Sequence, residues 1–249
     1  MQDYLIAETF TLPSKGKLYS QDVNPNVKLR SMTTNEEMKR LGKTDYPYKL
    51  LSEIIDDCLI EGPGISAYDL CIGDFQFLLH KLRCVTYGSE YSIESICPIC
   101  GKRNNYTINL DKLEVIEYED GIESNLHMTL PVTKKNIDLR LQSPRMLDEV
   151  QSRTKETLAK ASKFKGDPAI LFNLVSIIEK VDGQVLDGVK LEAFARQLPM
   201  QDVNYILKKL DKINIGINSE IEKECSGCGG AFHSALPITS EFFRPSIDG

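Results

Sequence analysis

The feature that most constrains this fold is a pair of Cys-x-x-Cys-Gly turns separated by most of the chain. The first turn contains Cys97 and Cys100, and the second contains Cys225 and Cys228. Short runs with strand character flank each turn, so the sequence predicts the same β-hairpin twice, with two thiols at each tip. The four predicted strands are residues 91–96, 106–110, 220–224 and 231–236.

The spacing within each turn points to metal binding. Two cysteines separated by two residues can aim both sulfurs at one point, and a following glycine allows the tight backbone path. Four thiolates suit a tetrahedral zinc ion, which predicts a structural Zn²⁺ site of Cys97, Cys100, Cys225 and Cys228. Residues 101–224 separate the two pairs, so a shared ion would join distant parts of the chain. In the alternative arrangement, each turn meets a turn of another copy, which would make the protein a homo-oligomer.

Other cysteine chemistry fits the sequence less well. A thioredoxin-type pair follows a strand and opens a helix, whereas both turns here have strands on each side. Seven cysteines and no secretory signal disfavour a disulfide framework. An iron–sulfur cluster also takes four thiolates and stays open at this point. The remaining thiols, Cys58, Cys71 and Cys84, share no ligand spacing and are interpreted, with His80, as structural residues of a helical stretch.

Composition narrows the function. The chain has 249 residues, 41% of them hydrophobic and 27% charged, which is ordinary for a globular protein. Its net charge of −6 argues against nucleic-acid binding, which usually needs a basic surface. The sequence shows no membrane span and no export signal, so we expect a cytoplasmic protein. Only three histidines are present, no nucleophile–base arrangement stands out, and a four-sulfur site leaves no open position for water. We therefore expect no enzymatic activity.

Element order predicts an α+β fold. We expect two helical segments around a central β-hairpin zinc module, with additional short strands. The whole chain is expected to form one integrated unit. Its predicted segments are residues 1–90, 91–142, 143–214 and 215–249. Periodicity predicts helices at about residues 33–41, 47–60, 73–87, 145–163, 168–181, 188–197 and 199–213. Alternation predicts further strands at residues 27–30, 126–131 and 137–141.

Two short stretches outside these elements also carry predictions. Residues 13–16, Pro-Ser-Lys-Gly, are predicted to form a turn between extended pieces. Near the end of the chain, Phe242 and Phe243 either enter the core or form an exposed apolar patch for a partner.

Several short motifs, taken in order, resemble the T4-type phage baseplate protein family. They are residues 12–19, 30–37, 73–75 and 87–88, the two cysteine turns, and residues 242–245. The resemblance implies a non-enzymatic tail assembly protein, an assembly chaperone that binds baseplate hub proteins in the cytoplasm of the infected bacterial host. A structural baseplate component retained in the virion is the alternative within the family. The family supplies no catalytic residues, and its cysteine pairs correspond to Cys97, Cys100, Cys225 and Cys228.

A zinc-ribbon nucleic-acid binder is the alternative from another functional class. Such a protein needs a basic face near its turns. Lys102 and Arg103 follow the first turn, but Glu220, Glu222 and Glu224 precede the second. The acidic strand disfavours nucleic acid as a partner.

Overall fold

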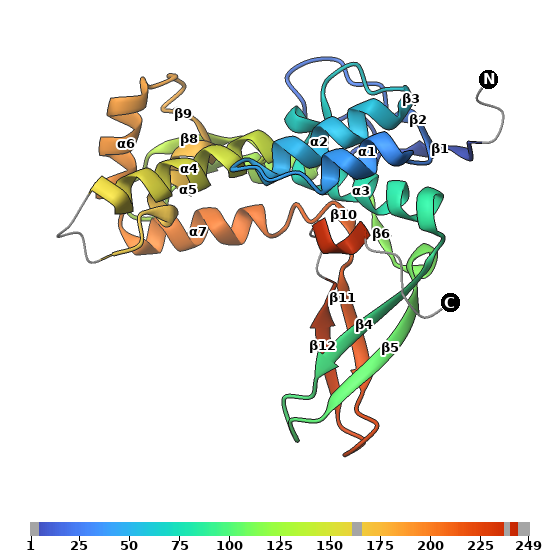
Figure 1. Ribbon diagram of the computed structural model, residues 1–249. Helices are drawn as coiled ribbons and strands as arrows, with labels where there is room; N and C mark the ends of the chain where they lie inside the picture. Colours follow the sequence, from blue (N-terminus) through green and yellow to red (C-terminus); the bar gives the residue numbers. More distant parts are fainter. Residues whose placement is uncertain (1–4, 161–165, 237–239, 244–249) are drawn as a thin grey trace.

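The protein consists of two helical lobes and a projecting arm (Figure 1). The computed structural model describes residues 5–160, 166–236 and 240–243. Residues 5–89 form the first lobe, residues 127–213 form the second lobe, and the hairpins at residues 90–109 and 220–235 form the arm. The predicted α+β class is confirmed. No helix in the described part of the chain combines the length and apolar character that crossing a bilayer requires.

The first lobe packs helices against a small antiparallel sheet of strand order β1-β2-β3. Its elements are β1 (Ala7–Thr11), β2 (Asn26–Arg30), β3 (Leu59–Glu61), α1 (Thr34–Arg40), α2 (Pro47–Cys58) and α3 (Ile72–Tyr87). Thr33 caps α1, because its side chain accepts a hydrogen bond from the Asn35 N–H while the Glu36 carboxylate accepts one from the Thr33 N–H. Helix α2 ends earlier than predicted, since β3 pairs with β2.

The second lobe combines an antiparallel sheet of order β7-β8-β9 with four helices. Its elements are β7 (His127–Thr129), β8 (Asn136–Leu139), β9 (Ile178–Val181), α4 (Pro144–Lys160), α5 (Ala169–Ile177), α6 (Gly188–Gln197) and α7 (Met200–Leu210). The sequence predicts one helix over residues 168–181, but its last four residues form β9 along β8. Periodicity cannot separate strand from helix in so short an apolar run. The unpaired edge of β8 offers backbone hydrogen bonds, and residues 178–181 take strand conformation to pair with it.

The two lobes contact each other directly. Asp148 on α4 is buried and accepts hydrogen bonds from the backbone N–H groups of Tyr48 at 3.3 Å and Lys49 at 2.8 Å. The second lobe thereby caps the start of α2, which has no side-chain cap from its own N-terminal residue. Arg145 on α4 also pairs with Asp69, with Nε 2.6 Å from the carboxylate. The expected central hairpin module between the helical segments is therefore wrong, because these contacts bring the lobes together and the hairpins project from them (Figure 1).

A close backbone approach joins α3 to the segment that follows α7. A Cβ atom on Gly73 would lie 2.1 Å from the carbonyl oxygen of Ile215, so only glycine fits there. Gly216 has φ +120°, which also favours glycine. Just beyond, β10 (Gly216–Ile217) pairs with β6 (Val115–Ile116). The chain ahead of the second hairpin is thus fixed to the first lobe.

The buried carboxylate of Asp74, in the first turn of α3, holds the predicted turn at residues 13–16. It accepts hydrogen bonds from the Ser14 N–H at 2.9 Å, the Ser14 hydroxyl and the Tyr19 hydroxyl at 2.6 Å. Leu18 takes a positive φ of 69° and packs against the core of the second lobe. Two of the short motifs behind the family resemblance, residues 12–19 and 73–75, therefore meet at the junction of the lobes.

The aromatic pair near the end of the described chain belongs to the core. Phe242 and Phe243 are 0% and 1% exposed. The Phe242 ring lies against His80 and Tyr91, with centroids 6.2 Å and 5.1 Å away, and burial lowers the pKa of His80 to about 4. The interpretation as core residues is confirmed, and the exposed patch for a partner is wrong. Residues 244–245, which complete that motif, lie outside the described residues.

Candidate metal centre

The arm consists of the two predicted hairpins, and both are confirmed. In the first, β4 (Glu90–Ile96) pairs with β5 (Arg103–Asn109). In the second, β11 (Glu220–Glu224) pairs with β12 (Ala231–Ala235). The two hairpins run side by side away from the lobes and end together (Figure 1). This parallel course brings the two cysteine turns to one place.

The two turns have the same backbone geometry. In the first turn the Gly101 N–H donates to the Cys97 carbonyl at 2.9 Å, and in the second the Gly229 N–H donates to the Cys225 carbonyl at 2.9 Å. The two glycines have φ values of +73° and +70°. These left-handed positions favour glycine, which explains why one follows the second cysteine of each pair.

The four cysteine sulfurs form one compact cluster. All of them lie within 4.8 Å of one another. The Sγ atoms of Cys97 and Cys228 are 3.8 Å apart, and those of Cys100 and Cys225 are 3.6 Å apart. Tetrahedral coordination with Zn–S bonds of about 2.3 Å places sulfurs about 3.8 Å apart, so the spacing fits such an ion. These separations are too long for disulfides, whose S–S bond is about 2.05 Å, and all four cysteines are free.

The surroundings of the four sulfurs stabilise the thiolate of Cys225 but not that of Cys100. The backbone N–H groups of Cys228 and Gly227 lower the pKa of Cys225 to about 6. For Cys100, the Lys102 backbone N–H lowers the pKa, but the nearby sulfurs of Cys225 and Cys228 outweigh it and raise the value to about 11. A divalent cation at the centre would replace the protons on such a cluster, since binding requires all ligands as thiolates.

Asn104 on β5 is a supporting residue that the sequence interpretation did not include. Its side chain is buried, and its Oδ1 accepts from the Ser226 N–H at 3.1 Å and the Ser226 hydroxyl at 2.7 Å. Its Nδ2 lies 3.6 Å from the Cys225 sulfur, in position to donate to it. The first hairpin thus holds the second turn. Asn104 lies four residues after Cys100, and Phe232 lies four residues after Cys228. An alignment of the two repeats therefore places a polar residue opposite an aromatic one, which is the sequence signal that marks Asn104.

The arm has little apolar core of its own. Its separate buried cluster consists of Cys97, Cys225 and Phe232, with Tyr106 partly buried against it. The Tyr106 hydroxyl also donates to the Glu224 carbonyl at 3.0 Å across the two hairpins. Ile93 and Ile108 belong to the core of the first lobe and fix the base of the arm. Farther out, a cluster of this size buries too little apolar surface to hold the strands together. A bound ion would supply what is missing.

Cys58, Cys71 and Cys84, with His80, have the structural roles expected of them. Burial raises the pKa values of Cys58, Cys71 and Cys84 to about 12, so they remain thiols in the helical body. His127 and His233 are both exposed on strands. Within the described residues, the four cysteines of the arm are the group of His, Cys, Asp or Glu side chains whose ligand atoms lie close enough together to hold a metal ion.

Comparison with known proteins places this architecture in a family. Residues 6–244 match the family model described as T4 bacteriophage base plate protein. The chain belongs to that family. The match spans both lobes and the arm, so the cysteine cluster lies within the family region. No curated protein matches the chain, and no solved structure matches it either.

Proposed function

We propose that this baseplate-family protein acts in tail assembly by binding subunits of the baseplate hub and that it catalyses no reaction. The observation that carries the proposal is the family match over residues 6–244, nearly the whole chain. The acidic balance of the sequence and the closed set of four sulfur ligands support a binding role over a catalytic one.

We also propose that Cys97, Cys100, Cys225 and Cys228 of one chain hold one structural zinc ion. The sulfur spacing supports this, and so does the small apolar core of the arm. Zinc would fix the two hairpins to each other and so hold the shape of the arm. The ion would then act on partner binding only through that shape.

Complementation tests the assembly role. A phage that lacks this gene should produce no complete tails, and expression of the wild-type chain in the host should restore them. A tagged copy purified from infected cells should carry hub subunits. Normal tails in the absence of the gene would refute the role.

Retention in the virion is a second candidate, favoured by the family description as a base plate protein. Mass spectrometry of purified virions separates the two. A fixed number of copies per tail would make the chain a structural component, whereas presence only in cell lysates would make it an assembly factor in the host cytoplasm.

Nucleic-acid binding is the remaining alternative. Lys102 and Arg103 are exposed beside the first turn, but Glu220, Glu222 and Glu224 lie on β11 of the same arm. Filter binding across a salt series should show no retention of DNA or RNA at physiological salt. Retention that weakens steeply with salt would support the alternative.

A further inference from the structure

The charge of the protein is unevenly divided. Residues 127–213, the second lobe, contain 15 Lys and Arg against 11 Asp and Glu, which gives a net charge of +4. The whole chain has a net charge of −6, so the remainder has a net charge of −10. An acidic partner segment would therefore be attracted more to the second lobe than to the rest of the protein.

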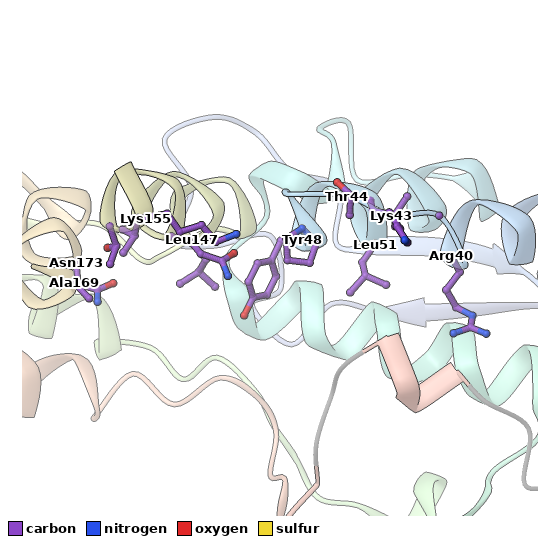
Figure 2. Close-up of a pocket in the computed structure, with 15 residues that line it drawn as sticks. Arg40, Lys43, Thr44, Tyr48, Leu51, Leu147, Lys155, Ala169 and Asn173 are labelled. Carbon is purple, nitrogen blue, oxygen red and sulfur yellow. The ribbon is translucent and has the colours of Figure 1, made fainter. Parts of the chain in front are cut away.

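A large groove lies at the boundary between the two lobes. It encloses about 1070 Å³ between the α1–α2 connection, α2, α4 and the start of α5 (Figure 2). Leu147, Val150 and Thr154 line it from α4, at a spacing that places them on one helix face over about 10 Å. Tyr48 and Leu51 line it from α2 at the same kind of spacing. Helices α2 and α4 are in contact, and together these residues form an apolar seam along the groove. A third helix could pack against this seam.

The charged groups among the described residues of the groove lining are cations, with no Asp or Glu among them. Lys43 lies on the α1–α2 connection and Lys155 on α4, and both are exposed. The guanidinium of the third cation, Arg40, donates hydrogen bonds to Glu37 at 2.6 and 2.8 Å, so its charge is already paired. Lys155 lies 3.8 Å from Asp45, a carboxylate whose side chain is 91% exposed. A contact that long and exposed leaves the lysine available to a stronger partner.

We propose that this groove binds an acidic amphipathic helix of a partner baseplate protein. Apolar residues spaced three and four apart would fill the seam over Leu51, Leu147 and Val150, as in other helix-in-groove complexes. Acidic residues beside that stripe would meet Lys43 and Lys155. The inference rests on the proposed binding function and names the kind of segment that is bound.

Two designed peptides test it with the full metal-loaded chain. Both carry leucines on one helical face, and the remaining positions are Glu in one and Lys in the other. In fluorescence anisotropy the Glu peptide should bind about tenfold more tightly than the Lys peptide, and added salt should weaken it. Lys43→Glu/Lys155→Glu should lower the affinity about tenfold. Lys208→Glu/Lys212→Glu changes two exposed lysines at and just beyond the end of α7 and should leave the affinity within about twofold.

Methyl NMR of the wild-type chain provides a measurement that no variant can confound. The Glu peptide should shift the signals of Leu51, Leu147 and Val150 more than those of the arm. Failure of the Glu peptide to bind, equal binding of both peptides, or no effect of the Lys43 and Lys155 reversals would overturn the inference. If the peptides fail while complementation succeeds, the assembly role stands and only the groove is rejected.

A photo-crosslinking residue at position 151, on the exposed rim of α4, identifies the natural occupant in infected cells. A crosslink to an acidic helical segment of a baseplate protein is the expected product. A crosslink to a second copy of this chain, or to a basic segment, would overturn the proposed occupant.

Discussion

The helical lobes and the arm are built from the same chain but are stabilised differently. Each lobe has an extensive buried apolar cluster, which the first lobe completes with Phe242 and Phe243. Among the described residues, the separate cluster in the arm has three buried members, two of which are cysteines. Apolar burial can therefore sustain the lobes. We expect the outer arm to depend instead on a metal ion held by its four cysteines, so the arm should respond to metal removal and the lobes should not.

Metal removal should give the largest effect. Structural zinc contributes about 10–16 kcal/mol in small zinc fingers, which is comparable with the whole stability of a domain at about 5–15 kcal/mol. Elemental analysis should find one zinc per chain. Chelation should abolish hydrogen-exchange protection in the outer parts of β4, β5, β11 and β12, whereas α3 and α5 should keep theirs. Iron in its place, or no metal in a folded reduced sample, would contradict the assignment.

Cys225→Ser should reproduce chelation, with proteolysis at residues 90–109 as well as at 220–235, because the lost ligand comes from one hairpin and the ion joins both. Cys84→Ser, at a half-buried thiol outside the cluster, is the matched control. If residues 1–110 of the Cys225 variant stay as protected as in wild type, the two turns do not share one ion.

Phe242→Ala should destabilise the first lobe by about 3–5 kcal/mol, since it removes a fully buried ring from the core. Thermal and denaturant unfolding measure the loss. Phe232→Ala provides the comparison, because that ring lies in the cluster of the arm. Phe232→Ala should weaken metal binding, and it should lower the midpoint of global unfolding much less than Phe242→Ala does. Equal effects of the two substitutions would mean that arm and lobes unfold as one unit.

Asn104→Ala should weaken the metal site without unfolding the lobes. Residues that hydrogen-bond to metal ligands typically contribute about 10–100-fold to metal affinity, and Asn104 bonds to both Ser226 and the Cys225 sulfur. Competition with a chromogenic chelator gives the affinity. Asn105→Ala, at the next and exposed position of β5, should behave as wild type. An unchanged affinity in both variants would remove Asn104 from the site.

Acid should show the smallest effect in the lobes. Burial acts to raise the pKa of Glu36, but hydrogen bonds from Arg30 and Thr33 outweigh it and lower the value from 4.5 to about 2. A lowered pKa means that the ionised carboxylate stabilises the fold above about pH 4.5 and that this contribution disappears as pH falls toward 2. Glu36→Gln should therefore cost about 1–2 kcal/mol at pH 7 and converge with wild type near pH 2.

Glu53→Gln, at an exposed position of α2, is the matched control and should change the free energy of unfolding at pH 7 by less than about 0.5 kcal/mol. The arm should respond to acid earlier, because protons compete with the metal for its thiolates. If the metal is released only at a pH lower than the one at which the lobes unfold, the arm is not the more acid-sensitive region and the proposed difference between arm and lobes is wrong.

The sequence by itself determined the local features of this protein. Repeated Cys-x-x-Cys-Gly turns with strand-forming flanks specify two hairpins, and the cap at Thr33 specifies the start of α1. Ordered short motifs were enough to indicate the family that the match over residues 6–244 then showed. In each case the information lies within a few neighbouring residues, where propensity and turn chemistry act.

Only the tertiary structure decided the features that depend on distant partners. Residues 178–181 became a strand because the edge of β8 offered hydrogen bonds. Asp148 capped α2 from another lobe, and Asn104 held a turn more than a hundred residues away. The lobes met directly and left the hairpins outside. Buried polar groups must find hydrogen-bond partners wherever the fold provides them, and local sequence does not contain the position of a partner that arrives from elsewhere in the chain.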